Sequence, residues 1–399
     1  MGSLSSPVLE LARPFLRGEL EKINPKLPSL IAVLKSVGAG ECWYKHGSFL
    51  HHLVDVYKIL KLWKAPEPVC LCGLFHSAYS NSYVNLAIFD PSTGRDVVRG
   101  HVGEVCRVAD PSLLRYTETN SDPRRPSLQE EGVFDGEEVW RKKLNGLVPE
   151  NGVVVKHIKT GEEVLVSRRV VGVFLLMTMA DFSDQFFGFR DELFCNNDGR
   201  LEFRGNNVTA LWPGDGKPGL WMNSSSRMGG IYNLIVREEE ILMEQRKRGY
   251  GSEFVARKER DEDIELVVPP VFSFCTKVLD AKEQIEARDT YWEAVSSDAS
   301  KEGYLERAEE RLLVCIEKNP FVGEPHVLLS QVYLGRKRFL EAEREAERGL
   351  VLLLQWGSPW DKRMSWEGWI AWVRVLLMKS SDQSWPDVSW GILNLGLVR

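Results

Sequence analysis

The apolar residues of the N-terminal part recur at the spacing of an α-helix. They lie three or four residues apart, at Leu53, Val56, Tyr57, Leu60 and Trp63. This spacing predicts an amphipathic helix with one buried face. Pro66 and Pro68 end that helix, and a second apolar segment begins at Val69. Residues 171–185 return to helical spacing, so this part of the chain is predicted to be mainly helical.

Three other patterns interrupt or follow these helices. Val153 to Val170 contains two β-branched runs around Lys159-Thr160-Gly161-Glu162, which predicts a β-hairpin. Residues 192–232 are rich in Gly, Asn and Pro and predict a long ordered loop. Residues 237–263 are densely charged with both signs, as is typical of a solvated helix and a linker.

The last third of the chain has a repeating helical pattern. Amphipathic helices are predicted over Tyr304 to Lys318 and over Phe339 to Leu354. Ala308 and Ala342 lie 34 residues apart. This is the period of tetratricopeptide repeats, whose paired helices need a small residue where they cross. The segment resembles such repeats, and the resemblance implies that residues 285–399 bind a protein partner.

Only two repeats are recognisable, and Ser330 stands where these repeats usually have Gly. Seven of the 13 Trp lie beyond residue 350, so this end of the chain is expected to be buried. Helical spacing in this part predicts a capping helix through Trp366, Trp369, Ile370, Val373 and Leu377.

Composition and charge narrow the classes of protein. The chain has 399 residues, enough for two or three domains, and 43% of them are apolar, which excludes disorder throughout. The net charge of −6 argues against a nucleic-acid-coating protein, since those carry a clustered basic face. No apolar run is long enough for a transmembrane helix; the longest, Val170 to Ala180, suits a buried element.

The cysteines and the N-terminus indicate a cytoplasmic setting. Seven Cys, an odd number, are thinly spread, and this pattern favours reduced buried thiols over a disulfide framework. No secretory signal or transit peptide is recognisable. The first residues fit the loose pattern for N-myristoylation at Gly2.

Histidine is concentrated in a short part of the chain. Five of the seven His fall between residues 46 and 101. His52 lies on the first predicted helix, His76 in the next apolar segment, and Asp181 at the end of a later apolar helix. Two imidazoles and a carboxylate meeting in a helical core would bind a divalent metal such as Mn, Fe or Zn. Alternatively, these side chains form hydrogen bonds inside the core.

The same pieces resemble the HD-superfamily metal-dependent phosphohydrolases, and are most similar to the SpoT-like hydrolases of guanosine tetraphosphate. The matching segments are HLVDVYKIL from His52, GLFHS around His76 and MAD ending at Asp181. The resemblance implies a mainly α fold, with an HD-like helical domain over residues 1–190 that includes the hairpin. It implies that these three residues hold the metal and that the substrate is a nucleotide-like phosphorylated small molecule. A family found in plants similarly joins an HD-like domain to a tetratricopeptide-like end.

The chain departs from the HD pattern at the residue that names it. Ser77 replaces the aspartate, and Ser80 and Asn81 replace the acidic pair that follows in the SpoT-like enzymes. A serine hydroxyl is a poor metal ligand and asparagine cannot act as a general base. The ligand shell could be completed by His51, His46, Asp90, Asp96 or His101. The nearest basic residues are either phosphate contacts or ordinary surface charges: Arg95, Arg99 and Lys45.

Two functions from different classes follow. The first is a metal-dependent hydrolase of a phosphorylated small molecule, in which the ion lowers the pKa of a water. The second is a catalytically inactive HD-like scaffold or sensor, and a purely structural interaction protein is a third.

Beyond the first domain, we expect a loop insertion and linker over residues 191–265 and the tetratricopeptide-like region over 266–399. The PGDGKPG segment is not a phosphate-binding loop, because Pro218 follows Lys217.

Overall fold

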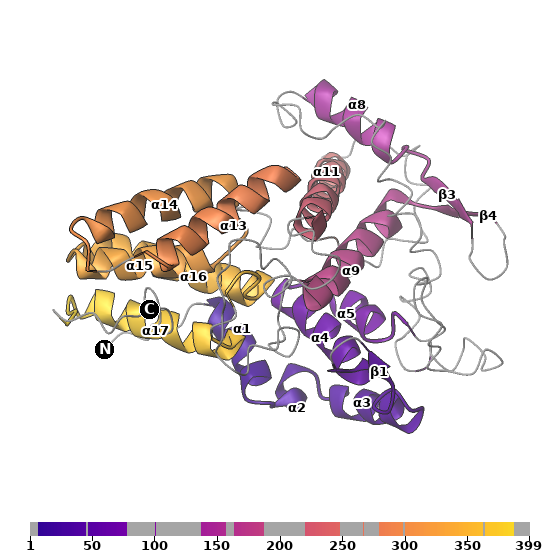
Figure 1. Cartoon of the computed structure of the whole chain (residues 1–399). Helices are drawn as coiled ribbons and strands as arrows, with labels where there is room; N and C mark the ends of the chain where they lie inside the picture. The colour runs from indigo at the N-terminus through magenta and orange to yellow at the C-terminus, as the bar shows by residue number, and fades with distance from the viewer. Residues whose placement is uncertain are drawn as a thin grey trace. The chain divides into compact units, whose positions relative to one another are not determined.

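The computed structural model describes residues 7–44, 47–77, 100, 137–156, 163–186, 220–247, 266, 279–297, 300–361 and 364–386. Within this part the chain is mainly helical, with two short antiparallel hairpins (Figure 1). The chain forms two compact units. We call residues 26–181 and 225–278 the histidine unit. The terminal unit comprises residues 1–25, 182–224 and 279–399.

The histidine unit is built on helices that bury apolar faces. Its described helices are α3 (Leu27–Ser36), α4 (Phe49–Leu62), α5 (Glu67–Leu74), α8 (Glu137–Leu147), α9 (Arg168–Phe186) and α11 (Leu220–Lys247). The predicted amphipathic helix is α4, and α5 follows it after a turn through Pro66. In Figure 1, α4 and α5 lie side by side, and α9 lies beside them.

The predicted hairpin is confirmed, but it is shorter than expected. Strand β3 (Val153–Lys156) pairs antiparallel with β4 (Glu163–Val166), and Val154 lies opposite Leu165. The turn between them lies outside the described residues. The expectation that the hairpin continues to Val170 is wrong, because α9 begins at Arg168. Residues 170–180 are all buried. A continuous apolar run of this kind can form either a buried helix or a buried strand, so its pattern does not distinguish the two.

The prediction of a loop over residues 192–232 is wrong for residues 220–232, which are helical. Residues from Leu220 onward belong to α11. Ser225 and Ser226 are buried in this helix, so tertiary burial outweighs the weak helix propensity of Ser and Gly. Residues 192–219 lie outside the described part of the chain.

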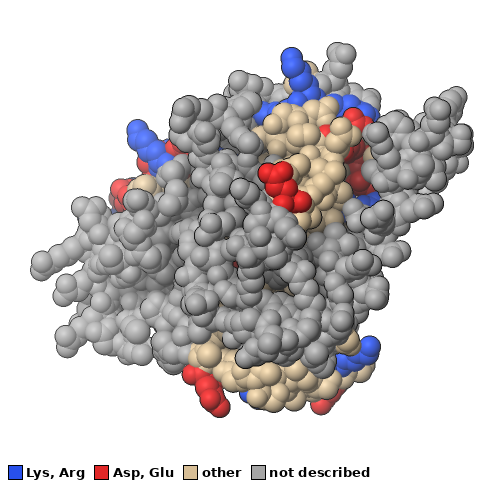
Figure 2. Space-filling model, turned by 90° about the vertical axis from the view of Figure 1, so that its right-hand side faces the viewer, with Lys and Arg blue, Asp and Glu red and all other residues tan. Residues whose placement is uncertain are grey.

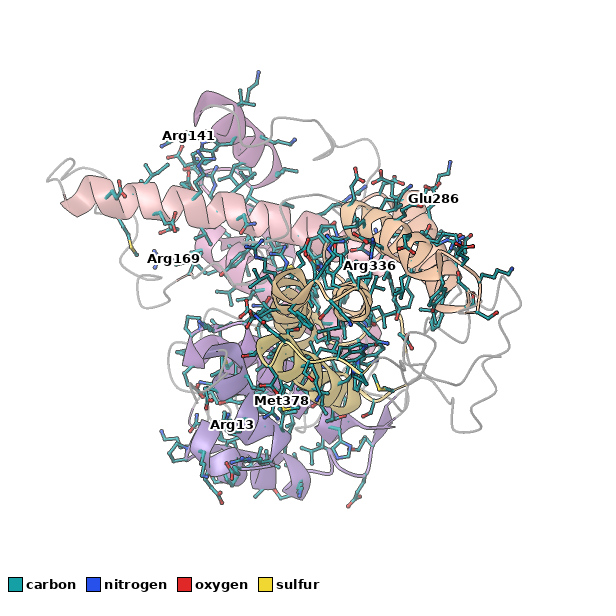
Figure 3. All side chains as sticks on the ribbon, turned by 90° about the vertical axis from the view of Figure 1, so that its left-hand side faces the viewer. Arg13, Arg141, Arg169, Glu286, Arg336 and Met378 are labelled. Atoms are coloured by element: carbon teal, nitrogen blue, oxygen red, sulfur yellow. The ribbon has the colours of Figure 1, made fainter. Side chains whose placement is uncertain are left out.

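The composition of α11 predicted a solvated charged helix, but part of this charge is buried. Arg169 of α9 pairs with Glu239 of α11 at 2.5 Å, and both side chains are more than nine-tenths buried. Arg168 pairs with Glu238 and also donates to the carbonyl of Val148. Figure 3 shows Arg169 on α9 beneath the long helix α11. These pairs join two helices within the histidine unit.

The terminal unit contains a row of antiparallel helices (Figure 1). Its described helices are α1 (Pro7–Leu16), α2 (Leu20–Ile23), α13 (Ala281–Val295), α14 (Tyr304–Lys318), α15 (Glu324–Gly335), α16 (Phe339–Trp356) and α17 (Trp366–Ser381). The helices predicted from Tyr304 and Phe339 and the Trp-rich helix are confirmed. Ion pairs of Arg336 with Glu309 and of Lys318 with Glu286 link neighbouring helices, and Figure 3 labels Arg336 and Glu286.

Small residues lie where the helices of the terminal unit approach closely. Ala308 and Ala342 are fully buried, as their spacing predicted. A Cβ atom on Gly349 would lie 2.7 Å from the Cγ2 atom of Val327, and one on Gly323 would lie 2.9 Å from the Cγ atom of Leu353. Glycine at these two positions therefore allows α15 and α16 to pack with their backbones close together.

The described cysteines are free thiols. Cys70, Cys72 and Cys315 are buried and Cys42 is partly exposed. Burial raises the pKa of the Cys315 thiol to about 12 and also raises that of Cys70. These buried thiols are therefore protonated and unreactive near neutral pH.

The described surface carries charges of both signs. On the face shown in Figure 2, Lys and Arg side chains lie among Asp and Glu side chains, and no single-sign field covers the described atoms. None of the helices in the described ranges combines the length and the apolar character needed to cross a bilayer.

Candidate metal centre

Helix α4 places His52 inside the histidine unit. Ser48 caps the helix, and its side-chain oxygen accepts a hydrogen bond from the His51 backbone N–H at 3.3 Å. His52 lies on the buried face of the helix with only 1% of its surface exposed. The ring of Phe49, one turn earlier, stacks on the His52 imidazole with 5.9 Å between centroids. The apolar face of α4 therefore carries one imidazole into the core.

Helix α5 places His76 beside it. A Cβ atom on Gly73 would lie only 2.4 Å from the Cδ1 atom of Leu60 on α4, so the glycine allows the two helices to pack closely. His76 follows the end of α5 and is 5% exposed. Its Nδ1 atom lies 2.7 Å from the Gly73 carbonyl oxygen. Since a carbonyl can only accept, Nδ1 carries the proton, and the lone pair of Nε2 faces His52 and Asp181.

Asp181 on α9 completes the group. Its Oδ1 atom lies 3.0 Å from Nε2 of His52 and 3.7 Å from Nε2 of His76. The two Nε2 atoms are 3.3 Å apart. The Asp181 side chain is 26% exposed, so the group has two buried imidazoles and a carboxylate that solvent can reach. We call His52, His76 and Asp181 the histidine triad.

The electrostatics of the triad favour a neutral His76. Burial lowers the pKa of the His76 imidazole below its ordinary value of 6.5, although the nearby Asp181 carboxylate raises it. A neutral imidazole is the form that binds a metal ion.

The spacing of the three atoms fits a shared ion. Two ligands held about 2.1 Å from one metal lie about 3.0 to 3.4 Å apart at octahedral to tetrahedral angles. The three ligand atoms all lie within 4.8 Å of one another, and the two shorter separations fall within the expected interval. Two imidazoles and one carboxylate suit Mn, Fe or Zn. The residues present therefore fit a divalent metal.

Of the other ligand candidates considered from the sequence, His51 is the one that lies in the described part of the chain. His51 is exposed on α4, although it is the neighbour of His52. The remaining candidates for ligands or phosphate contacts lie outside the described residues: Lys45, His46, Asp90, Arg95, Asp96, Arg99 and His101. Ser80 and Asn81 lie outside them as well.

Ser77, which follows His76 in the chain, is completely buried. Its Oγ atom has no hydrogen-bond partner among the residues that the structure describes. A hydroxyl here brings no negative charge next to His76, so Asp181 supplies the one carboxylate of the histidine triad.

Several supporting residues were not identified from the sequence. Phe49 and Gly73 orient the two imidazoles, as described above. Glu67, at the start of α5, accepts hydrogen bonds from Tyr57 at 2.9 Å and from Lys61 at 2.6 Å, both on α4. For the contact between Gly73 and His76, the sequence did offer a signal: a glycine three residues before a histidine in an apolar run.

Part of the chain is similar to a known protein family. A model of a family described as a domain of unknown function, DUF6817, matches residues 33–108. The matched segment contains His52 and His76, whereas Asp181 lies beyond it. Neither the curated proteins nor the solved structures contain a match to this chain.

Proposed function

We propose that the chain is a divalent-metal-binding protein with an HD-like domain and that it hydrolyses a nucleotide-like phosphorylated small molecule. The observation that carries the proposal is the convergence of His52, His76 and Asp181 at ligand-like distances. When bound, a divalent ion supplies Lewis acidity that activates water for attack on phosphorus.

The chain's own residues supply the positioning. The Gly73 carbonyl fixes the tautomer of His76, and Phe49 fixes the plane of the His52 ring. Such outer contacts hold metal-binding histidines in the required orientation. The partly exposed Asp181 side chain marks the side from which a small polar ligand reaches the triad.

A second candidate function is a catalytically inactive HD-like scaffold or sensor that binds a protein through its tetratricopeptide-like helices. Ser77 favours it, because a buried hydroxyl replaces the acid that the HD phosphohydrolases carry at this position. The distances of 3.0 and 3.3 Å also suit hydrogen bonds in which a proton on Nε2 of His52 is shared between Oδ1 of Asp181 and Nε2 of His76.

The test uses two adjacent histidines as a matched pair. Wild type, His52→Ala, Asp181→Asn and His51→Ala are purified as full chains after loading with Mn, Fe or Zn, and metal content is measured by elemental analysis. We expect about one equivalent in wild type and in His51→Ala, and little in the other two variants. Circular dichroism verifies that each variant is folded.

Phosphate release from nucleotides and other phosphoesters is then measured with the loaded proteins. Release that requires His52 and Asp181 but not His51 supports the hydrolase. Metal binding without release of phosphate supports the sensor. A folded wild type that takes up no metal would exclude the metal-dependent hydrolase.

A further inference from the structure

The three ligand atoms of the histidine triad form a triangle with unequal sides. Oδ1 of Asp181 lies 3.0 Å from Nε2 of His52 and 3.7 Å from Nε2 of His76. The two Nε2 atoms are 3.3 Å apart. Both imidazoles approach the same carboxylate oxygen, so the three separations define where an ion equally close to all three atoms would lie.

The size of this triangle distinguishes between coordination geometries. Ligand atoms about 2.1 Å from one ion lie about 3.0 Å apart at the angles of an octahedron and about 3.4 Å apart at those of a tetrahedron. The side of 3.0 Å agrees with the octahedron. The side of 3.3 Å agrees with the tetrahedron, and the side of 3.7 Å exceeds both values. The triangle as a whole is therefore too wide for one face of an octahedron.

The height of the ion above the triangle gives the same answer. With the three observed separations, an ion about 2.1 Å from each atom would lie roughly 0.8 Å from their plane. A regular tetrahedron requires a height of about 0.7 Å, whereas an octahedron requires about 1.2 Å. The histidine triad thus has the dimensions of three corners of a tetrahedron, and these residues leave the fourth corner open.

Contacts around the imidazoles hold them in this arrangement. The His52 ring stacks on Phe49, and Nδ1 of His76 is bonded to the Gly73 carbonyl oxygen. Both imidazoles are buried. Zinc has no geometric preference from its d electrons and is usually four-coordinate with such ligands, whereas manganese favours octahedral sites. Zinc is therefore the ion that requires the least rearrangement of these side chains.

The charge of the triad indicates which ligand would take the fourth corner. Two neutral imidazoles and the Asp181 carboxylate leave a divalent ion with one uncompensated positive charge. Ser77, beside His76 in the chain, is buried and offers only a neutral hydroxyl. The Asp181 side chain is 26% exposed, so solvent reaches the triad at the carboxylate. An anion bound through one oxygen would complete both the coordination and the charge.

We propose that the histidine triad is a four-coordinate zinc site whose fourth position takes water or a single oxygen of a phosphate-type anion. This inference rests on metal binding by the triad, which is part of the proposed function, and it adds the identity of the ion and the way a ligand binds to it. A four-coordinate site has one exchangeable ligand, whereas an octahedral site with the same three residues would have three.

Cobalt(II) is the probe for the geometry, because four-coordinate cobalt absorbs visible light intensely and six-coordinate cobalt absorbs it weakly. The full chain is freed of metal and loaded with cobalt, and the absorption per bound ion is measured. We expect intense bands in wild type and in His51→Ala, since His51 is exposed. The bands should be lost in His52→Ala and in Asp181→Asn. Circular dichroism verifies folding, and Asp181→Asn, which keeps the side-chain size, decides if His52→Ala does not fold.

Inorganic phosphate tests the fourth position. Added to the cobalt-loaded wild type, it should shift the bands and keep their intensity, because one oxygen ligand replaces another. Intense bands that phosphate does not shift would show that a further side chain fills the fourth position, and this would overturn the inference. So would intense bands that persist in both His52→Ala and Asp181→Asn.

The outcomes also separate this inference from the proposed function. One bound cobalt ion with the weak bands of six-coordination overturns the four-coordinate site and leaves metal binding by the triad intact. A wild type that binds neither cobalt nor zinc overturns both. X-ray absorption of the zinc-loaded chain should give four nitrogen or oxygen ligands about 2.0 to 2.2 Å from the ion, and six ligands would contradict the inference.

Discussion

Two groups of buried polar side chains in the described structure, one in each compact unit, differ in how their polar atoms are arranged. In the histidine triad, three atoms that can bind a metal point at one another across 3.0 to 3.7 Å. In the terminal unit, the carboxyl groups of Glu324 and Asp361 instead accept hydrogen bonds from two backbone N–H groups and from the Tyr291 hydroxyl. The first arrangement is the one that a shared metal ion would require, whereas the second is typical of a structural contact.

The difference also concerns access. The triad has a carboxylate that is 26% exposed, while Glu324 and Asp361 are fully buried. Among the described residues, solvent therefore reaches the carboxylate of the histidine triad but not the two carboxyl groups of the terminal unit.

Breaking the buried ion pair between α9 and α11 should have the largest effect. Arg169→Ala leaves the buried Glu239 carboxylate without this guanidinium, and loss of one partner of a buried pair costs about 3 to 5 kcal/mol. Hydrogen exchange should show loss of protection in the histidine unit only. The double variant Arg169→Met/Glu239→Leu should recover much of the loss, and equal instability of the double variant would show that the charge is not the cause.

Metal binding should stabilise one unit and not the other. At a metal concentration 100 times the dissociation constant, the histidine unit should gain about 2.7 kcal/mol. Exchange protection measured with and without Zn or Mn should rise in α4, α5 and α9 and stay unchanged in α13–α17. His76→Ala should abolish the gain. A similar gain in that variant would place the metal elsewhere.

Gly73→Ala should weaken the triad by disturbing its support. The new Cβ atom would lie 2.4 Å from the Cδ1 atom of Leu60, so either the Leu60 side chain or α5 must shift, at a cost of about 1 to 3 kcal/mol. Metal affinity should fall roughly tenfold because the carbonyl that orients His76 moves. Gly146→Ala on α8 is the control, since nothing lies within 4 Å of its added methyl group. An equal loss of affinity in both variants would contradict this role of Gly73.

Ser330→Ala should have the smallest effect and should be confined to the terminal unit. The Ser330 hydroxyl donates to the buried carbonyl of Ala342 at 2.7 Å, and loss of such a bond costs about 1 kcal/mol. Exchange in α15 and α16 should increase about fivefold, with metal content unchanged. Unchanged exchange would show that the hydroxyl bond adds nothing to the packing of these helices.

The helices that carry the triad could be predicted because each has a clear apolar pattern. His52 falls on the apolar face of α4, and Asp181 follows an uninterrupted buried run in α9. The 34-residue step between Ala308 and Ala342 likewise marked two helices at the correct residues. Periodicity reports which face is buried, so it succeeds where burial alone decides the structure.

Contacts between distant segments could not be predicted in the same way. The charges of Glu238 and Glu239 are typical of a solvated helix, and only the approach of Arg168 and Arg169 makes their burial tolerable. The contact between Glu324 and the residues that join α16 to α17 depends on the backbone N–H groups of Trp360 and Asp361, which no side-chain pattern records. Tertiary pairing overrides composition at each of these positions.

The order of the triad along the chain has a consequence for how the protein forms. His52 and His76 lie on neighbouring helices 24 residues apart, whereas Asp181 comes about 130 residues after His52. Local contacts form early, and distant ones wait for a costly loop closure. The two imidazoles should therefore be assembled well before the carboxylate reaches them. A growing chain would hold metal weakly, and tight binding would report that the long-range fold is complete.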